Sequence, residues 1–376
     1  MKYRFFIFSI SLISLNFFSQ NKLIVAGKEI KNQYQETLKL LSACNEKYYK
    51  GFTGDSSVIK NNIYNFSIPD YNDDIPRPFR FLFKTGKNKV FKVSDIFYLS
   101  KKTSRVNFNF GNNEIILNRK DKIYNEILNY KSYMKSYTAK KNELDSITFR
   151  INESNHFKLE KITTDSLQNL YKKLDQSEDS LLLSLSKKTP DSYILFWRLV
   201  QKFESKGYKN GYDQIFNNLN TSVKKSSVGL IFDDQLKKSE KIALGSLFPD
   251  LIFNNRHVLA KLGIKYTLID FWFSYCQPCI ADFPKYKEMY SKYHHSGFEI
   301  LNISTDRTKD KDNWKRVIKE KELIWDHFLD ENGMKAKQYN INKFPTNFLL
   351  DASGRIIKKD ITPEELEIYL NENLKQ

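Results

Sequence analysis

The sequence predicts an α/β fold in the C-terminal third of the chain, preceded by a small antiparallel β domain and a helical segment. A hydrophobic stretch from Tyr266 to Phe273 runs almost directly into two cysteines spaced C-x-x-C, Cys276 and Cys279. A second apolar stretch follows after a helix-length segment, and a hairpin-like pair of β-prone runs comes before a C-terminal helix. The expected boundaries are 1–20 for a signal peptide, 21–120 for the β-rich domain, 121–240 for the helical segment and 241–376 for the α/β domain.

The strands of the α/β part are expected to form a mixed sheet. Tyr266–Phe273 and Phe298–Ser304 are almost wholly apolar, as buried strands are, and the segment between them makes a βαβ unit with parallel strands. Thr346–Leu350 and Arg355–Lys358 flank Asp351-Ala352-Ser353-Gly354, a turn signal that predicts an antiparallel hairpin.

The chain ends in a predicted helix that begins at Thr362. Thr362, Pro363 and Glu365 supply the N-cap, the N1 proline and the glutamate of a capping box. Asp312–Glu322 and Met334–Tyr339 are predicted as further helices. An apolar stripe should turn the last helix toward the core, and it comprises Leu366, Tyr369, Leu370 and Leu374.

Cys276 and Cys279 form a candidate redox pair. Two thiols at this spacing in the first turn of a helix can close a disulfide, and the helix N-terminus favours the thiolate of the first one. Cys276 is therefore the candidate nucleophile, and Cys279 is the candidate resolving thiol.

A C-x-x-C pair is also half of a zinc site, so metal binding is the main competing interpretation. Zinc needs four ligands. The remaining cysteine is Cys44, far upstream, and His294 and His295 are adjacent rather than spaced as a ligand pair. Haem attachment requires a histidine directly after the second cysteine, where this chain has Ile280. We therefore expect no metal and no cofactor beyond the cysteine pair.

The order of the motifs resembles the thioredoxin superfamily. Asp270-Phe271-Trp272 precedes the two cysteines, and Phe344-Pro345-Thr346 stands just ahead of a predicted strand. Phe248-Pro249-Asp250-Leu251 is similar to a segment ahead of the core in exported thiol:disulfide oxidoreductases of the TlpA/ResA and redoxin type. The resemblance covers roughly Leu244 to Gln376 and implies a thioredoxin fold there.

The resemblance implies roles for two acids. In thioredoxins the acid that matches Asp270 helps to deprotonate the resolving cysteine, which here is Cys279. A carboxylate inside an apolar strand is costly to bury, so its pKa should be raised. Many thioredoxins place a lysine beside this acid, and we expect Ile300 at that position. Asp282 matches an active-site glutamate of ResA-like proteins. The alternatives are a water-exposed acid near a strand end for Asp270 and a solvated helix residue for Asp282.

The resemblance also implies a surface that holds a substrate polypeptide. Pro345 is expected to be cis and to present the Phe344 backbone beside the dithiol for strand-like pairing. Tyr275 is expected on the exposed rim around Cys276, whereas Trp272 is expected to contribute more to packing than to chemistry. The candidate substrate-binding residues are Phe344, Pro345, Thr346, Tyr275, Gln277, Pro278 and Trp272.

The residue before the second cysteine bears on the direction of electron flow. Strongly oxidising relatives carry a histidine there, which stabilises the thiolate, whereas this chain has Pro278. Potentials in the superfamily span roughly −270 to −120 mV, and we expect the reducing half of that range.

The N-terminus has the pattern of a secretory signal peptide. Lys2 and Arg4 precede an apolar run from Phe5 to Phe18, and Ser19-Gln20-Asn21 follows it. The run is shorter than the roughly 20 residues that a membrane span takes. We expect cleavage after this run and a periplasmic protein, with an uncleaved inner-membrane anchor as the alternative.

Composition limits the classes of partner. The chain has 376 residues, is 40% hydrophobic and carries a formal charge of +17. Such a surplus favours anionic surfaces, so association with a membrane surface stays open. The charge is spread along the chain without a recognition motif, so we expect no nucleic acid partner. The expected partners are protein thiols or disulfides and a membrane or periplasmic electron donor.

The front part of the chain is less informative. Short β-prone runs at Ile63–Ile68, Phe79–Phe83 and Val106–Phe110 predict the small antiparallel domain, and Ser192–Glu204 is the clearest predicted helix. A β domain and a helical segment ahead of such a module resemble exported thioredoxin-like proteins of Bacteroidota. The helix carries an apolar stripe that is expected to be core, formed by Tyr193, Phe196, Trp197, Val200 and Phe203.

These features favour an exported thiol:disulfide oxidoreductase in which Cys276 attacks a substrate disulfide and Cys279 resolves the mixed disulfide. Two alternatives stay open. A peroxiredoxin-like peroxidase is disfavoured because the threonine that such enzymes place before the reactive cysteine is Phe273 here. The other is a non-enzymatic periplasmic binding or scaffold protein with a static disulfide. Cys44 is expected to be a lone buried thiol, with exchange with Cys276 as the alternative.

Overall fold

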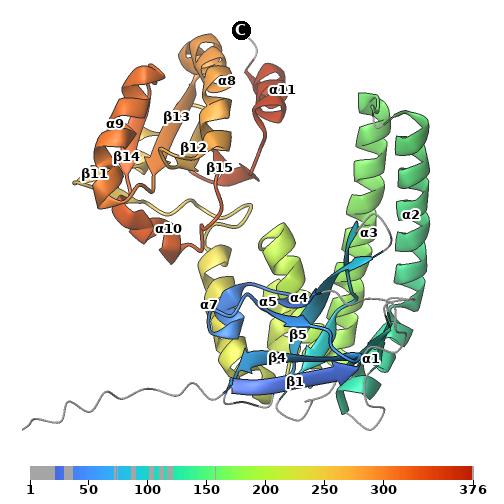
Figure 1. Cartoon of the computed structure of the whole chain (residues 1–376). Helices are drawn as coiled ribbons and strands as arrows, with labels where there is room; N and C mark the ends of the chain where they lie inside the picture. Colours follow the sequence, from blue (N-terminus) through green and yellow to red (C-terminus); the bar gives the residue numbers. More distant parts are fainter. Residues whose placement is uncertain are drawn as a thin grey trace, which may run out of the picture. The chain divides into compact units, whose positions relative to one another are not determined.

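The structure is a computed structural model (Figure 1). It describes residues 22–28, 37–71, 73, 75–85, 90–100, 106–109, 114–116, 122–156 and 158–374. The chain divides into two compact units between Lys135 and Ser136. The predicted signal peptide lies outside the described residues, and the finer boundaries at 120 and 240 stay predictions.

The first unit is antiparallel, as predicted. Its main sheet has the order β3-β2-β5-β6, with β7 also paired to β5, while β1 pairs with β4 and β8 with β9. The strands are β1 (Lys22–Lys28), β2 (Thr37–Ser42), β3 (Gly54–Val58), β4 (Ile63–Pro69), β5 (Arg77–Thr85), β6 (Val90–Val93), β7 (Phe97–Leu99), β8 (Asn107–Asn109) and β9 (Glu114–Ile116).

Aromatic side chains fill the interior of this unit. Phe81 stacks on Phe66 with ring centroids 5.8 Å apart, and its centroid lies 4.6 Å from that of Phe97. Cys44 is buried in the same unit. The short helix η1 (Glu46–Tyr49) follows β2, and α1 (Lys122–Tyr133) ends the unit.

The second unit begins with a helical segment, as predicted. Ser192 accepts a hydrogen bond from the backbone N–H of Leu195, 3.1 Å away, and thereby caps α4. Phe196, Trp197 and Val200 are completely buried and Phe203 is buried too, which confirms the predicted core stripe except at Tyr193, which is half-buried. The helices are α2 (Lys135–Ser154), α3 (Lys161–Lys188), α4 (Tyr193–Lys206), α5 (Tyr212–Asn218), α6 (Thr221–Lys224) and α7 (Ser227–Glu240).

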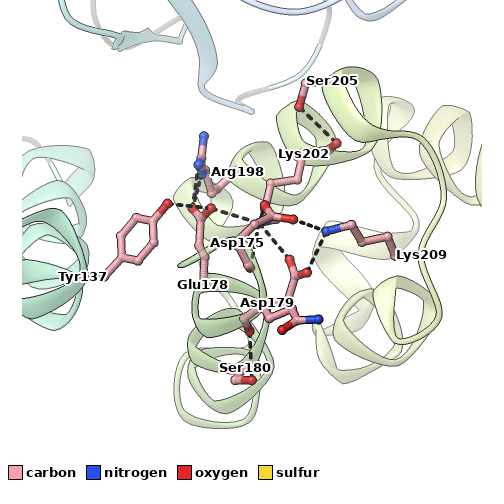
Figure 2. A network of polar contacts seen from close by, with 10 residues as sticks. Tyr137, Asp175, Glu178, Asp179, Ser180, Arg198, Lys202, Ser205 and Lys209 are labelled. Atoms are coloured by element: carbon pink, nitrogen blue, oxygen red, sulfur yellow. Dashed lines mark hydrogen bonds and ion pairs between the residues drawn. The ribbon is translucent and has the colours of Figure 1, made fainter. Parts of the chain in front are cut away.

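A network of ion pairs joins α3 to α4 (Figure 2). Lys202 is 2% exposed, and its ammonium lies 2.7 Å from Asp175, 2.9 Å from Glu178 and 2.8 Å from Asp179. The network also includes Arg198, Lys209 and Tyr137. Three carboxylates thus face three cations, so the charges balance around the buried Lys202 and Glu178, as a structural network requires.

The remainder of the second unit is a mixed sheet in the order β14-β13-β12-β15-β16. The central strand β12 (Tyr266–Trp272) runs parallel to β13 (Phe298–Ser304), which is parallel to β14 (Asp326–Leu329). β15 (Thr346–Asp351) is antiparallel to β12, and β16 (Ile356–Lys359) is antiparallel to β15. The predicted βαβ unit and hairpin are therefore confirmed.

Successive side chains along each strand of this sheet point to opposite faces, and each face packs into its own hydrophobic core. Leu268, Trp272 and Ile300 belong to the core that contains residues of α8 (Gln277–Tyr293), α9 (Lys311–Glu320) and α11 (Pro363–Asn373). Ile269 and Phe271 belong to the opposite core, beside α10 (Met334–Gln338) and the segment before the sheet. The short elements are β10 (Ile252–Phe253), β11 (Arg256–His257), η2 (Leu259–Lys261), η3 (His294–Ser296), η4 (Thr308–Asp310) and η5 (Glu331–Gly333).

Local signals in the sequence form as expected. The Asp351 side chain accepts hydrogen bonds from the backbone N–H groups of Ser353 and Arg355, and Gly354 takes a φ of 79° in the hairpin turn. Thr362 and Glu365 form the predicted capping box of α11. In the described part of the chain, no helix is long and apolar enough to cross a membrane.

Candidate active site

The two cysteines lie where the central strand β12 passes into α8. Cys276 is the N-cap of α8 and forms a disulfide with Cys279, with 5.3 Å between their Cα atoms. The Cys276 sulfur accepts a hydrogen bond from the Cys279 backbone N–H at 3.3 Å. The first sulfur therefore lies at the positive end of the helix dipole, where a thiolate is stabilised once the disulfide is reduced.

The residues around the cysteines divide into exposed and buried ones. Tyr275 is 56% exposed, and Gln277 and Pro278 are also exposed, as a rim that meets a substrate requires. Trp272 is completely buried and packs edge-on against Phe283, with 5.1 Å between ring centroids. Trp272 therefore supports the turn from beneath, and its burial corrects its inclusion among the substrate-binding candidates.

The Phe344–Pro345 peptide bond is cis, as expected, and this loop lies against the dithiol turn. The Phe344 ring meets the Phe273 ring edge-on at 5.4 Å between centroids, three residues before Cys276. Thr346 follows in register with Phe271 of β12. The structure thus brings the candidate substrate-binding loop and the candidate nucleophile together from segments far apart in sequence.

Asp270 is buried beneath the dithiol turn. Its side chain is 1% exposed and points to the same face of the sheet as Leu268 and Trp272, whose core also contains both cysteines. Burial raises the pKa of Asp270 to about 8, and the negative charge of Asp282 adds to this shift. An acid with this pKa can hold or release a proton near neutral pH.

The prediction that Ile300 lies beside Asp270 is wrong. Asp270 pairs across β13 with Asn302, whereas Ile300 pairs with Leu268. The parallel register is set by where the two strands start, Tyr266 opposite Phe298, and this cannot be read from the apolar pattern alone. The position is therefore polar, but it carries an amide rather than a cation.

Asp282 is half-buried on α8, and its negative charge raises the pKa of Asp270. Burial raises the pKa of Asp282, the nearby charge of Glu364 raises it further, and Lys285 opposes both. Lys285 and Glu364 form an ion pair with each other. The two acids singled out from the sequence thus belong to one electrostatic site, although their catalytic roles stay predictions.

A buried aspartate that the sequence analysis missed fixes the segment before Cys276. The Asp306 carboxylate accepts hydrogen bonds from the Ser274 backbone N–H at 2.9 Å, the Ser274 hydroxyl at 2.7 Å and the Ser304 hydroxyl at 2.6 Å. Asn313 donates to the Ser274 hydroxyl at 2.7 Å. Asp306 could have been found from its position two residues after β13, which is parallel to β12. The carboxyl ends of neighbouring parallel strands meet at one edge of a sheet, and functional side chains often gather there.

Among the residues that the structure describes, no group of three or more His, Cys, Asp or Glu side chains could hold a metal ion. The chemistry that these residues support is dithiol exchange, with a buried acid on the sheet face that packs into the core containing both cysteines.

A family model described as thioredoxin-like matches residues 263–356. The thiol-disulfide oxidoreductase ResA of Bacillus cereus strain ATCC 10987 is 29% identical over 147 residues, which cover 37% of this chain and 84% of that protein. ResA of a second Bacillus cereus strain, ZK, is 30% identical over 138 residues, which cover 35% of this chain and 79% of that protein.

Solved structures of Bacteroides proteins are similar over the same share of the chain. A thiol-disulfide oxidoreductase from Bacteroides fragilis is 32% identical, covers 34% of this chain over 100% of its own length, and gives a TM-score of 0.31. The thioredoxin domain of a thiol-disulfide oxidoreductase from Bacteroides vulgatus is 29% identical, covers 35% of this chain over 99% of its own length, and gives a TM-score of 0.32.

Proposed function

The chain belongs to the ResA-like thiol-disulfide oxidoreductases of the thioredoxin superfamily, and from this membership we propose that it is exported and reduces or exchanges disulfides of protein substrates through Cys276 and Cys279. The observation that carries the proposal is the disulfide at the N-terminus of α8, with the cis-proline loop packed beside it.

The reaction transfers two electrons from the reduced pair to a substrate. The Cys276 thiolate attacks one sulfur of the substrate disulfide, and the other substrate sulfur leaves as a thiolate. Cys279 then attacks Cys276 in the mixed disulfide, which releases the second substrate sulfur and closes the Cys276–Cys279 bond. In this proposal Asp270 takes the proton of Cys279, while Phe344 and Pro345 pair with the extended substrate chain.

The cycle needs an electron donor outside the cytoplasm. Each turnover leaves the pair oxidised, so a membrane or periplasmic reductant has to restore the dithiol. The N-terminal signal pattern supports such a location, and export remains part of the proposal. N-terminal sequencing of the protein recovered from a periplasmic extract tests export and cleavage together.

The decisive measurement is the equilibrium potential of the pair in the mature protein, obtained by trapping thiols across a glutathione or dithiothreitol series. A value near or below about −250 mV supports a reductase, and one above about −150 mV supports an oxidase or isomerase. A pair that stays oxidised down to about −330 mV is a static disulfide, and this outcome sinks the enzymatic proposal.

Two variants distinguish the roles of the cysteines. C279S should accumulate a mixed disulfide with a model substrate such as insulin, because the resolving thiol is missing, and C276S should form none. C44S is the matched control and should behave as the parent. Equal trapping by C276S and C279S would contradict the assignment of the nucleophile.

A further inference from the structure

Three polar side chains lie side by side in the apolar face beneath α8. Asp270 of β12 is in register with Asn302 of β13 on one side and with Asn347 of β15 on the other. All three are at least nine-tenths buried. Their strand neighbours on the same face, Ile300 and Leu349, are apolar core residues.

The amide of Asn302 has a fixed orientation. The indole Nε1–H of Trp325 donates to Asn302 Oδ1 at 2.8 Å. Because an indole can only donate, the oxygen of the amide has to face Trp325 and its nitrogen has to face away. That nitrogen lies 3.4 Å from Asp270 Oδ2.

The other neighbours leave the second oxygen of Asp270 open. Asn347 is occupied by the backbone N–H of Ile361 at 2.9 Å, the Ile361 carbonyl at 3.0 Å and the Tyr286 hydroxyl at 3.4 Å. Within the described part of the chain, Asp270 Oδ1 is buried without a hydrogen-bond partner. An amide N–H can only donate, and it donates best to an unprotonated oxygen, so this contact favours Oδ2 as the acceptor and Oδ1 as the oxygen that carries the acidic proton.

We propose that Asn302, held by Trp325, is a positioning residue that occupies Oδ2 of Asp270 and so makes Oδ1 the oxygen that exchanges a proton with the resolving thiol. This inference rests on the proposed function. In the resolving step the Cys279 S–H bond breaks, its proton passes to Oδ1, and the sulfur attacks Cys276 as the substrate thiolate leaves.

The other groups that face Asp270 explain why a hydrogen bond from Asn302 should affect its pKa. From α8 it is faced by Asp282, which is negative when ionised, and by the neutral Tyr286, and each of these is coupled to it electrostatically. From β13 and β15 it is faced by the two amides. No cation offsets the burial of Asp270 among these groups, and the Asn302 N–H, 3.4 Å away, is the hydrogen-bond donor that faces its carboxylate.

The test is to follow the protonation of Asp270 in the full mature protein by the infrared carbonyl band of its protonated carboxyl, identified by its loss in D270N. N302L removes the donor at similar volume, and we expect the titration midpoint to rise by about one pH unit, the size of one hydrogen bond to a charged group. The pH midpoint of disulfide exchange should move with it. I300V, on the same face of the same strand, controls for packing and should move neither.

W325F provides a second variant that keeps Asn302 but releases its oxygen. We expect a smaller rise of the same midpoint, because the amide can then rotate. If N302L does not fold, an unchanged midpoint in W325F overturns the inference. An unchanged midpoint in a folded N302L also overturns it. The infrared titration is independent of turnover, so failure of the proposed function, seen as absence of disulfide exchange in the parent, is a separate result.

Discussion

Replacing Asp270 by asparagine should stabilise the protein, and the gain should depend on pH. Burial raises the pKa of Asp270 from 3.8 to about 8 in the folded state. Below pH 4 the carboxyl is protonated in both states, so it has no differential effect. Between about pH 4 and 8 the unfolded chain has lost this proton while the folded protein keeps it. Stability therefore falls as the pH rises through this window.

The size of the effect follows from the shift. Each pKa unit corresponds to 1.36 kcal/mol, so a shift of about four units corresponds to a loss of roughly 5 kcal/mol by pH 8 and above. Asparagine has nearly the same shape and does not titrate. The free energy of unfolding of D270N, minus that of the parent, should therefore rise by roughly 1.4 kcal/mol per pH unit from pH 4 to 8 and then level off.

The assay is urea unfolding of the oxidised protein, so that no cysteine of the pair titrates. Tryptophan fluorescence reports on the correct region, since three of the four tryptophans, Trp272, Trp314 and Trp325, lie in the α/β part. E367Q changes an exposed acid on α11 and controls for the loss of one charge. A difference between D270N and the parent that stays constant from pH 4 to 9 would refute the reasoning.

Other variants test the neighbouring interactions. D282N should lower the pKa of Asp270, because it removes a negative charge that raises it, and an infrared titration of the carboxyl measures this. D306N should reduce the free energy of unfolding by about 1–3 kcal/mol and slow disulfide exchange, since its amide cannot accept every bond from Ser274, and urea unfolding and an exchange assay measure the two effects. K202M should destabilise by about 3–5 kcal/mol in urea unfolding, because it leaves buried carboxylates uncompensated.

Each of these variants has a control or a contradicting result. K237M removes an exposed partner of Asp233 and should leave the free energy of unfolding nearly unchanged, so equal losses in K237M and K202M would contradict the structural role of the network. A D306N protein as stable as the parent would show that the turn before Cys276 does not depend on the carboxylate. An upward shift of the Asp270 midpoint in D282N would reverse the inferred sign of their coupling.

The sequence predicted best those features that depend on neighbouring residues. The capping box at Thr362, the turn at Asp351 and the strand ahead of Cys276 all formed, since each is specified by residues a few positions apart. The resemblance placed Pro345 beside the cysteines, and the packing of Phe344 against Phe273 confirms that proximity.

Features that depend on strand register could not be read in the same way. A strand register that placed Ile300 beside Asp270 was expected, but a parallel register depends on where each strand starts, and the neighbour is Asn302. Asp306 was missed because its partner Ser274 is 32 residues away in sequence and no local pattern joins them. The pairing of Lys202 with α3 is likewise a property of helix packing rather than of spacing.

The disulfide at the start of α8 closes a very short loop, because its cysteines are only three residues apart. In the chain-entropy model a cross-link of this span restricts the unfolded chain by roughly 2 kcal/mol, compared with 4.7 for a loop of 100 residues. In this model, opening the bond therefore costs less than half of what opening a 100-residue loop would cost, so a short loop limits how much each cycle of oxidation and reduction disturbs the fold. Less of the free energy of electron transfer is then spent on changes in folding, and more of it is available to the substrate disulfide. A short-loop disulfide therefore suits a protein that is oxidised and reduced repeatedly better than one whose disulfide only stabilises the fold.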